Sequence, residues 1–425
     1  MRFLFLGTTI AALSVIFSAC GNNSAGNTAT GPSSLKDVPA VRLNYRYEAD
    51  VPPPDAAKNA NTDERSAAVQ GDFDQNRPQE VLDKSIFSPD RKRILAVYHR
   101  ATDAPAEFRL DMYTGDGKIL KRITPDTMAV HFPDTIRWSP DSSTVAFVAM
   151  VRVASADIQN EQLPVNPAPE MNAAETNSNV EASPAATPPP APANVLTFRT
   201  EQLYFCGAEG DGLKPVTQNE GLIYFYYVWS PDSTALAALA ATNREWQILN
   251  QQADLKGEVY LPVGRSRMIE KNGRERRLDD AMTTVQPVWS PDSSKIAVAY
   301  DKQIRIYDAA GNPPTQAAIP LRNNLLLSSQ TYDRDQQAKL DAANTQANAN
   351  IPVNGQSNST QGAATLPDEN SLVSFNPIVL LNWTADDLLY FQTAFVKRMK
   401  NETDSVTSFP RWHRLVLSPQ PATAK

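Results

Sequence analysis

The chain has 425 residues, of which 41% are hydrophobic, with a formal net charge of −7 and an isoelectric point near 5.2. General nucleic-acid binding needs a basic face, so this acidity argues against a nucleic-acid partner. After residue 17 no apolar stretch approaches the length of a membrane-spanning helix, so we expect no later segment to cross a membrane.

The first segment, residues 1–19, has the pattern of an export signal. Arg2 supplies a positive charge, and residues 3–17 form an apolar stretch that is followed by small residues before Cys20. This stretch is shorter than the ~20 residues that a membrane-spanning helix needs. The sequence therefore predicts a signal peptide.

The end of this segment, Ser18-Ala19-Cys20-Gly21, resembles the lipobox of bacterial lipoproteins, in which the cysteine is acylated and becomes the mature N-terminus. The resemblance implies lipidation at Cys20, with the membrane as a partner, since two or three acyl chains anchor a protein stably. Gly21, rather than Asp, follows the cysteine, which in a Gram-negative cell favours the outer membrane, facing the periplasm. An ordinary signal peptide with a coincidental cysteine is the alternative.

Residues 20–40 are predicted to form the lipidated cysteine and a flexible tether, because they carry few apolar side chains. The next segment, 41–79, begins with an alternation of apolar and polar residues at 41–49 that is typical of a strand and continues as a linker. We interpret this strand as a candidate for the fourth strand of the last repeat, where it would close a ring of sheets.

A tetrapeptide related to Trp-Ser-Pro-Asp occurs five times, each time between two apolar runs. In a type I turn Ser suits the first position, Pro the second, and Asp the third, where it hydrogen-bonds its own backbone. The aromatic residue before each turn is expected to pack between neighbouring sheets. The copies are Phe87-Ser88-Pro89-Asp90, Trp138-Ser139-Pro140-Asp141, Trp229-Ser230-Pro231-Asp232, Trp289-Ser290-Pro291-Asp292 and a diverged Trp383-Thr384-Ala385-Asp386.

The repeat predicts an all-β fold, a β-propeller of four-stranded blades over residues 80–419, with a tail at 420–425. Five blades are counted, and a sixth stays open. The two longest intervals between turn aspartates contain polar, low-complexity inserts at 156–193 and 330–370, which we expect to be disordered and to project from the face opposite the turns. Without them each interval is about 50–60 residues, close to the ~40–50 of a blade.

These repeats resemble the WD-repeat-like propeller repeats of the TolB type, which occur in the periplasmic TolB protein and in some peptidases. The resemblance rests on the five turns and on strand–turn units such as residues 203–212. It implies the fold and is nearly silent on function. The chain departs from the TolB pattern in having no room for an additional N-terminal domain and in the residue after Pro-Asp. That residue is usually Gly and in this chain is Arg91, Ser142, Ser233, Ser293 or Asp387.

A basic residue follows the second strand of every predicted blade. These residues are Arg100, Arg152, Arg244, Lys302, Lys397 and Arg398. We expect all of them at the rim that carries the inserts, where a ring of positive charge would attract an anionic ligand. The alternative is that strand ends meet water, where Lys and Arg are readily accommodated.

Catalytic motifs are scarce. His99, His131 and His413 lie in different blades without the spacing of a metal-binding motif, and no nucleophile elbow, phosphate-binding loop or Cys-x-x-Cys pair occurs. Cys206 lies in a predicted strand and is expected to be a small buried core residue. We therefore predict no metal site, no cofactor and no identifiable catalytic residue.

Two functions stay open. The favoured hypothesis is a membrane-anchored envelope lipoprotein whose propeller is a binding or scaffold module for an envelope protein or an anionic glycan. The alternative is a hydrolase or lyase with an active site in the propeller channel, because propeller enzymes assemble such sites from residues scattered over several blades.

The lipobox-like motif predicts that Cys20→Ser releases the protein into the soluble envelope fraction, because the variant has lost the atom that carries the acyl chains. Membrane fractionation with acyl-chain labelling checks this. The prediction is contradicted if the variant stays in the membrane fraction with the gel mobility of the parent and the parent takes up no acyl label.

Overall fold

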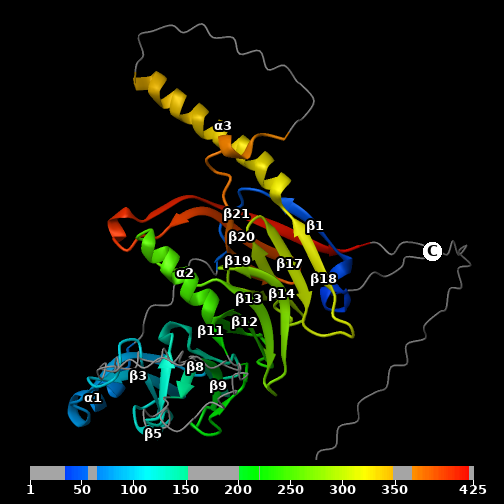
Figure 1. Cartoon of the computed structure of the whole chain (residues 1–425). Helices are drawn as coiled ribbons and strands as arrows, with labels where there is room; N and C mark the ends of the chain where they lie inside the picture. Colours follow the sequence, from blue (N-terminus) through cyan, green and yellow to red (C-terminus); the bar gives the residue numbers. More distant parts are fainter. Residues whose placement is uncertain (1–33, 56–64, 152–200, 220, 348–365, 421–425) are drawn as a thin grey trace, which may run out of the picture.

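The computed structural model describes residues 34–55, 65–151, 201–219, 221–347 and 366–420 (Figure 1). In these ranges the chain forms five antiparallel sheets, and three α-helices accompany them. The sheets follow one another along the chain, and each is built mainly of four strands in meander order. The protein is an all-β propeller with five blades.

Four of the five sheets take their strands from one stretch of the chain, and the fifth adds β1 from the N-terminal side. The first sheet contains β2 (Glu80–Phe87), β3 (Arg93–Arg100), β4 (Arg109–Thr114) and β5 (Ile119–Arg122). The second contains β6 (Met128–His131), β7 (Arg137–Trp138), β8 (Thr144–Val151), β9 (Gln202–Gly207) and β10 (Lys214–Pro215). The third contains β11 (Leu222–Trp229), β12 (Ala235–Thr242), β13 (Gly264–Glu270) and β14 (Glu275–Thr283). The fourth contains β15 (Val288–Trp289), β16 (Lys295–Tyr300), β17 (Gln303–Asp308) and β18 (Gln316–Pro320). The fifth contains β19 (Ile378–Ala385), β20 (Leu388–Lys397), β21 (Val406–Pro419) and β1 (Leu43–Glu48).

Helices interrupt this pattern at three points. The α-helices are α1 (Ala67–Asn76), α2 (Asn243–Leu255) and α3 (Arg322–Ala347). Short 3₁₀ helices are η1 (Leu35–Asp37), η2 (Ala40–Arg42), η4 (Pro133–Thr135), η6 (Glu369–Ser371) and η7 (Glu402–Asp404). Both α2 and α3 are insertions between consecutive strands, whereas α1 precedes the first blade.

The fifth sheet joins the two ends of the described chain. β1 pairs antiparallel with β21, with Tyr45 opposite Leu417, and so supplies the fourth strand of this sheet. The residues just before β1 also dock on the fourth sheet. The backbone N–H of Ala40 donates to the Asp308 carboxylate at 3.0 Å, and that carboxylate also pairs with the buried Lys295 at 3.3 Å. The last residues assigned to the tether are therefore part of the folded body.

The Ser-Pro-Asp turns have the geometry that their sequence predicts. In the third blade the Ser230 hydroxyl donates to the Asp232 carboxylate at 2.6 Å, and this carboxylate accepts the backbone N–H of Thr234 at 3.1 Å. The first, second and fourth turns repeat both hydrogen bonds. The side chains of each of these turns thus form its closing hydrogen bonds without a contact from a neighbouring blade.

The tryptophans before these turns join each blade to the one before it. The indole N–H of Trp138 donates to the carbonyl of Ile86 at 3.2 Å, and Trp229 and Trp289 make the same bond to the residue before the preceding aromatic, at 3.3 and 3.1 Å. All three rings are buried in apolar clusters between consecutive sheets. Trp383 differs, because its indole N–H bonds within its own turn, to Asp386.

A second bond crosses the same interfaces and explains the departure from glycine. The residues after Pro-Asp in the second, third and fourth turns, Ser142, Ser233 and Ser293, have φ between 60° and 63°, a left-handed conformation that favours Gly. Their hydroxyls accept the backbone N–H of the preceding blade's turn aspartate, at 3.0 to 3.1 Å. Serine therefore contributes a contact between blades that glycine could not make.

The first sheet has a different partner on each face. Along β3, Leu95 and Val97 pack in the cluster shared with the second sheet, whereas Ala96 and Tyr98 pack against α1. Arg77, which caps the end of α1, lies over the Tyr98 ring and donates to a buried carboxylate of β4. Helix α1 therefore covers the face of the first blade that points away from the second.

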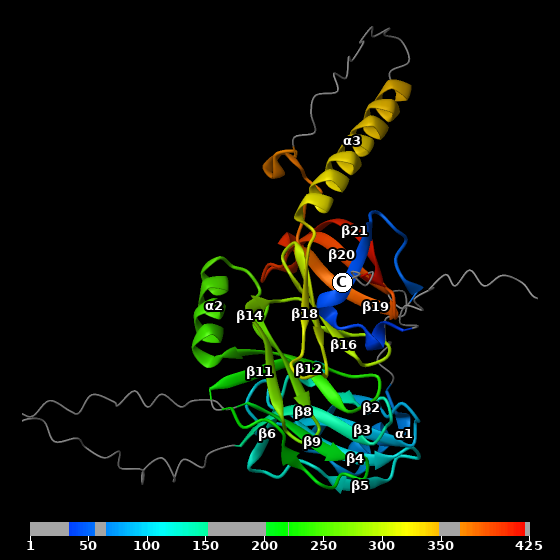
Figure 2. The ribbon, with the colours of Figure 1, turned by 90° about the vertical axis from the view of Figure 1, so that its right-hand side faces the viewer.

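The second insert begins inside helix α3, which corrects its predicted extent. Residues 330–347, assigned to the insert by composition, continue a helix that starts at Arg322; residues 348–365 and the whole of 156–193 lie outside the described residues. Leu325 and Leu326 anchor its first turns, and helix-favouring Ala, Gln and Lys residues extend it. Figures 1 and 2 show that the rest of α3 projects from the sheets.

The interfaces between blades predict that Trp229→Ala lowers the free energy of unfolding by about 3–5 kcal/mol, because it leaves a cavity and removes the indole bond. Urea unfolding checks this, with Trp412→Ala as the control, since Trp412 is only half-buried in β21. Equal losses of unfolding free energy in the two variants would show that Trp229 contributes no more to stability than a half-buried tryptophan outside the interfaces.

Candidate functional site

A cavity of about 540 Å³ lies where several sheets meet. Its walls come from four blades: η4 in the second, Tyr226 of β11 in the third, Gln286 before β15 in the fourth, and Leu380 of β19 in the fifth. These residues lie near the starts of the first strands, at the rim opposite the Ser-Pro-Asp turns. We call this cavity and its extension, described next, the channel-mouth groove.

The extension is a second cavity of about 320 Å³ that shares four lining residues with the first: Leu261, Thr284, Val396 and Arg398. It continues toward helix α2. Because the two cavities share a wall, together they form an elongated depression that runs from Tyr226 and Leu380 toward helix α2.

One wall of the groove is a bridge between two blades that are not neighbours. The segment after α2 pairs with the hairpin tip between β20 and β21: Val259 N–H donates to the Arg398 carbonyl, and Lys400 N–H donates to the Gly257 carbonyl, both at 2.9 Å. Lys400 also pairs with Asp254 of α2 at 2.8 Å. Figure 1 shows α2 beside this hairpin. The third and fifth blades are thus tied together over the channel mouth.

Helix α2 is fixed in place by its first turn and by aromatic packing. Thr242 and Glu245 form a capping box, in which each side chain satisfies a backbone N–H at the start of the helix. Trp246 then packs against Phe225 at 5.4 Å and Tyr260 at 4.9 Å between ring centroids. This packing holds the groove wall against the third blade.

The larger cavity of the groove is lined by apolar, hydroxyl and amide side chains with one arginine, and its extension adds Lys256, Lys397 and Glu258. Leu261 and Leu380 are each 38% exposed, a high value for leucines that line a cavity. Burial raises the pKa of Tyr226 to about 12, so its hydroxyl stays protonated. Among the described residues that line the larger cavity there is no His, Cys, Lys or carboxylate, and Arg398 carries its formal charge. The lining suits binding of an apolar segment with a neighbouring acidic group.

The predicted basic residues divide into two groups. Arg100 pairs with Glu80 and Asp126, both at 2.8 Å, Lys302 pairs with Asp301 at 3.2 Å, and Lys397 approaches Glu258 at 3.8 Å. Arg244 and Arg398 are exposed, and neither has a carboxylate within 4.0 Å in the part of the chain that is described. Arg152 lies outside the described residues, as does Cys20. The ring as a ligand site stays a prediction, now centred on Arg398, which lines the groove.

The three histidines lie in separate environments. His99 bonds Asp83 at 2.8 Å and is partly exposed. His131 bonds the Glu201 carboxylate at 2.8 Å; its Nε2 and the other Glu201 oxygen are buried and have no hydrogen-bond partner among the described residues. His413 is fully buried between Tyr47 and Thr393.

Other chemical groups are equally dispersed. Burial raises the pKa of the Cys206 thiol to about 11, as suits a core position. Within the described ranges no three His, Cys, Asp or Glu side chains gather as a metal site would require. In the same ranges no helix is both long and apolar enough to span a membrane.

Comparisons with known proteins give a fold likeness and nothing more specific. No family model matches the chain, and no curated protein sequence matches it. Solved structures that resemble it include prolyl oligopeptidase B of Galerina marginata (9% identity over 80% of this chain and 36% of that one, TM-score 0.38). Others are an oligogalacturonate lyase of Vibrio parahaemolyticus (9%, 82% and 68%, TM-score 0.35) and a TolB of Agrobacterium tumefaciens (11%, 81% and 91%, TM-score 0.33).

The chain spans about a third of the length of the prolyl peptidases that it matches. With every one of these TM-scores below 0.5, none of these proteins carries information about what this chain binds. The function has to be argued from the groove itself.

The environment of His413 generates a pH prediction. Burial, with a smaller contribution from Arg411, lowers its pKa to about 3, against about 6.5 in an unfolded chain. Between these values the unfolded state binds a proton that the folded state does not. Stability should therefore fall as the pH drops below 6.5, and this residue adds about 1.4 kcal/mol per pH unit to that slope.

Urea unfolding between about pH 6 and pH 4 measures this slope. The variant His413→Gln should be less stable at neutral pH, because Gln cannot keep both side-chain hydrogen bonds in the same geometry, yet it should show a shallower loss toward acid. Parallel pH profiles for parent and variant would contradict the assignment.

Proposed function

We propose that this protein is a lipid-anchored lipoprotein of the bacterial cell envelope whose propeller acts as a scaffold, binding a partner protein in the channel-mouth groove. The observation that carries the proposal is the groove itself, which is elongated, partly exposed and mainly apolar, with Arg398 at its wall. The export signal and the motif at Cys20 support the envelope location, and Gly21 favours the outer membrane, facing the periplasm.

The partner that best fits the groove is an extended protein segment with apolar side chains and an acidic residue. Exposed leucines gain free energy when another apolar surface covers them, at about 25 cal/mol per Å². Arg398 can pair with a carboxylate, and its guanidinium forms such bonds in a bidentate geometry. A glycan, with its dense hydroxyl groups, is less suited to walls in which Leu, Val, Phe and Pro predominate.

The alternative of a hydrolase or lyase in the channel is less well supported by the described lining. General acid–base catalysis needs a group that titrates near the working pH and reaches the substrate. The buried His131–Glu201 pair joins an imidazole to a carboxylate, but its two unbonded atoms are sealed from solvent and the pair does not line the groove. Binding is therefore the function that these side chains favour.

In-cell photo-crosslinking tests the proposal directly. A photoreactive phenylalanine in place of Leu380, in the groove, should give a discrete adduct with another envelope protein. The same residue in place of Leu120 of β5, which is equally exposed at 39%, is the matched control and should give none.

A second variant shows whether the adduct depends on the groove surface. Leu261→Asp, combined with the photoreactive residue at position 380, should strongly reduce the yield of the adduct. Binding of the partner would bury the new carboxylate in an apolar wall. Absence of an adduct at position 380, or the same adduct at positions 380 and 120, would refute the proposal.

A further inference from the structure

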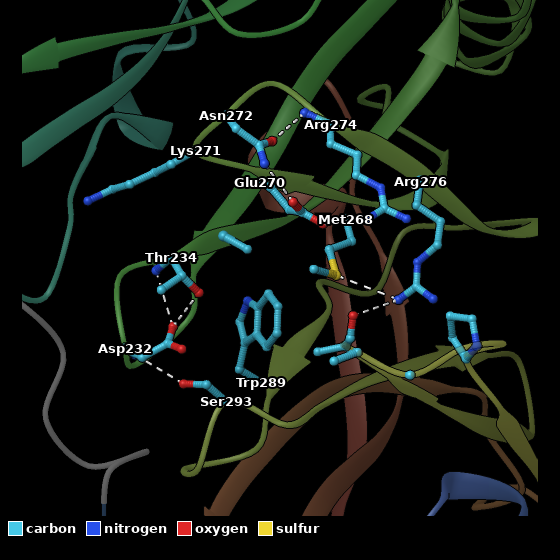
Figure 3. A pocket seen from close by; sticks show the side chains of 15 residues that line it. Asp232, Thr234, Met268, Glu270, Lys271, Asn272, Arg274, Arg276, Trp289 and Ser293 are labelled. Carbon is cyan, nitrogen blue, oxygen red and sulfur yellow. Dashed lines mark hydrogen bonds and ion pairs between the residues drawn. The ribbon is translucent and has the colours of Figure 1, made fainter.

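A separate cavity of about 560 Å³ lies on the opposite rim, between the third and fourth sheets (Figure 3). Three segments surround it: the turn at Asp232, the hairpin tip between β13 and β14, and the turn between β17 and β18. None of its lining residues belongs to the channel-mouth groove. Whatever it does is therefore independent of the function proposed above.

The aromatic residue in this cavity is Trp289, held in place by its indole bond to Val228. One interface earlier, the Lys271 ammonium lies 5.3 Å from the ring of Trp229 and 3.8 Å from Asp141, and so covers that tryptophan. Among the described residues no cation lies over the Trp289 ring. At the interface between the third and fourth sheets, a cavity therefore lies where a lysine covers the tryptophan of the preceding interface.

Arg276 brings a half-buried positive charge to the cavity. Its Nη2 donates to the carbonyls of Asp308 at 2.6 Å and Ala309 at 3.2 Å, and no carboxylate of the described chain lies within 4.0 Å of its guanidinium. Burial and the nearby Arg274 lower the pKa of Arg276, although the more distant Asp308 and Glu270 carboxylates act to raise it. A bound anion would relieve this cost, because it would supply a counter-charge in direct contact.

The lining also contains groups that pair well with hydroxyls, of which Glu270 is already paired with Arg274 at 3.7 Å. Asp232, Glu270, Thr234, Ser293 and Asn272 contribute carboxylate, hydroxyl and amide groups. Partial burial acts to raise the pKa of Asp232, but hydrogen bonds from its own turn outweigh it and lower that pKa, so the group stays ionised as an acceptor.

Figure 3 shows how these groups are distributed. Arg274 and Arg276 lie on one side of Trp289, and Asp232, Thr234 and Ser293 lie on the other. A ligand lying across the indole would therefore meet the guanidinium groups at one end and the hydroxyl-binding groups at the other.

We propose that this cavity binds an acidic sugar, a uronic acid unit with its carboxylate toward Arg276 and Arg274, its hydroxyls toward Asp232 and Thr234, and its ring over Trp289. A phosphate fits less well, because its second negative charge would be repelled by the Asp232 and Glu270 carboxylates of the same lining. A neutral sugar leaves the charge of Arg276 unpaired. The unit can be free or part of an anionic glycan chain.

Calorimetric titration of the purified full-length protein in detergent tests this assignment. The probes are glucuronate, a glucuronate-containing oligosaccharide, glucose and inorganic phosphate, all at equal ionic strength. Glucuronate should bind at least about tenfold more tightly than glucose or phosphate, as one charge-assisted pairing provides. Tighter binding of the oligosaccharide identifies a glycan chain as the source, and equal binding identifies the free sugar acid.

Two variants and a matched control locate the site. Arg274→Gln and Arg276→Gln should each weaken glucuronate binding at least about tenfold without changing glucose binding. Arg277→Gln should not, because Arg277 is exposed, pairs with Asp280 and is absent from the lining. Arg276 also donates hydrogen bonds to two backbone carbonyls, so its replacement can lower stability as well as binding. If Arg276→Gln lowers the melting temperature, the test of the site rests on Arg274→Gln.

The inference is wrong if glucuronate does not bind at millimolar concentration, if phosphate binds as tightly, or if Arg277→Gln weakens binding as much as Arg274→Gln. Loss of the photo-crosslink at Leu380 would leave it untouched, and failure of the sugar to bind would leave the groove proposal untouched.

Discussion

The rest of this structure depends on a pair of hydrogen bonds repeated at consecutive blade interfaces, one from an indole N–H to a carbonyl and one from a turn N–H to a serine hydroxyl. Each of the first four blades is closed by its own Ser-Pro-Asp turn, and the second, third and fourth are joined to the blade before them at two fixed points. The tryptophan ring is buried beside these bonds, so apolar burial stabilises the interface. The hydrogen bonds are directional and can form in only one alignment of the two blades. The three apolar clusters between the first four sheets follow from this register.

One consequence is that the two rims of the propeller differ in how much the chain can vary. At the turn rim the backbone is fixed by the repeat, so variation is confined to side chains such as Lys271, which covers Trp229, and Arg276, which opens onto a cavity. At the opposite rim the connections carry no interface bonds of this kind and tolerate insertions. Helices α2 and α3 arise there, and the bridge from α2 to the β20–β21 hairpin builds the channel-mouth groove.

The sequence predicted the features that repeat and missed those that occur once. The five turns and the aromatic residue before each of them indicate the propeller. Helices α1 and α2 are not predicted, although Ser66 before α1 and the Thr242–Glu245 capping box before α2 are helix-start signals. Replacement of Gly by Ser142 or Ser233 was noted as a departure, but its reason lies in a contact with another blade. The groove was beyond prediction, because its lining comes from four sheets; of the predicted basic ring, Arg398 and Lys397 line it.

The central claim is that the indole bonds of Trp138, Trp229 and Trp289 hold consecutive blades together as one cooperative unit, whereas Trp383 bonds within its own turn. Native-state hydrogen exchange of the four indole N–H groups, followed by NMR in low urea, tests it most directly. We expect the first three to exchange with one common free energy, equal to that of global unfolding. Exchange of any of these three at a markedly lower free energy than the other two would contradict the claim, because the blades would then separate without unfolding.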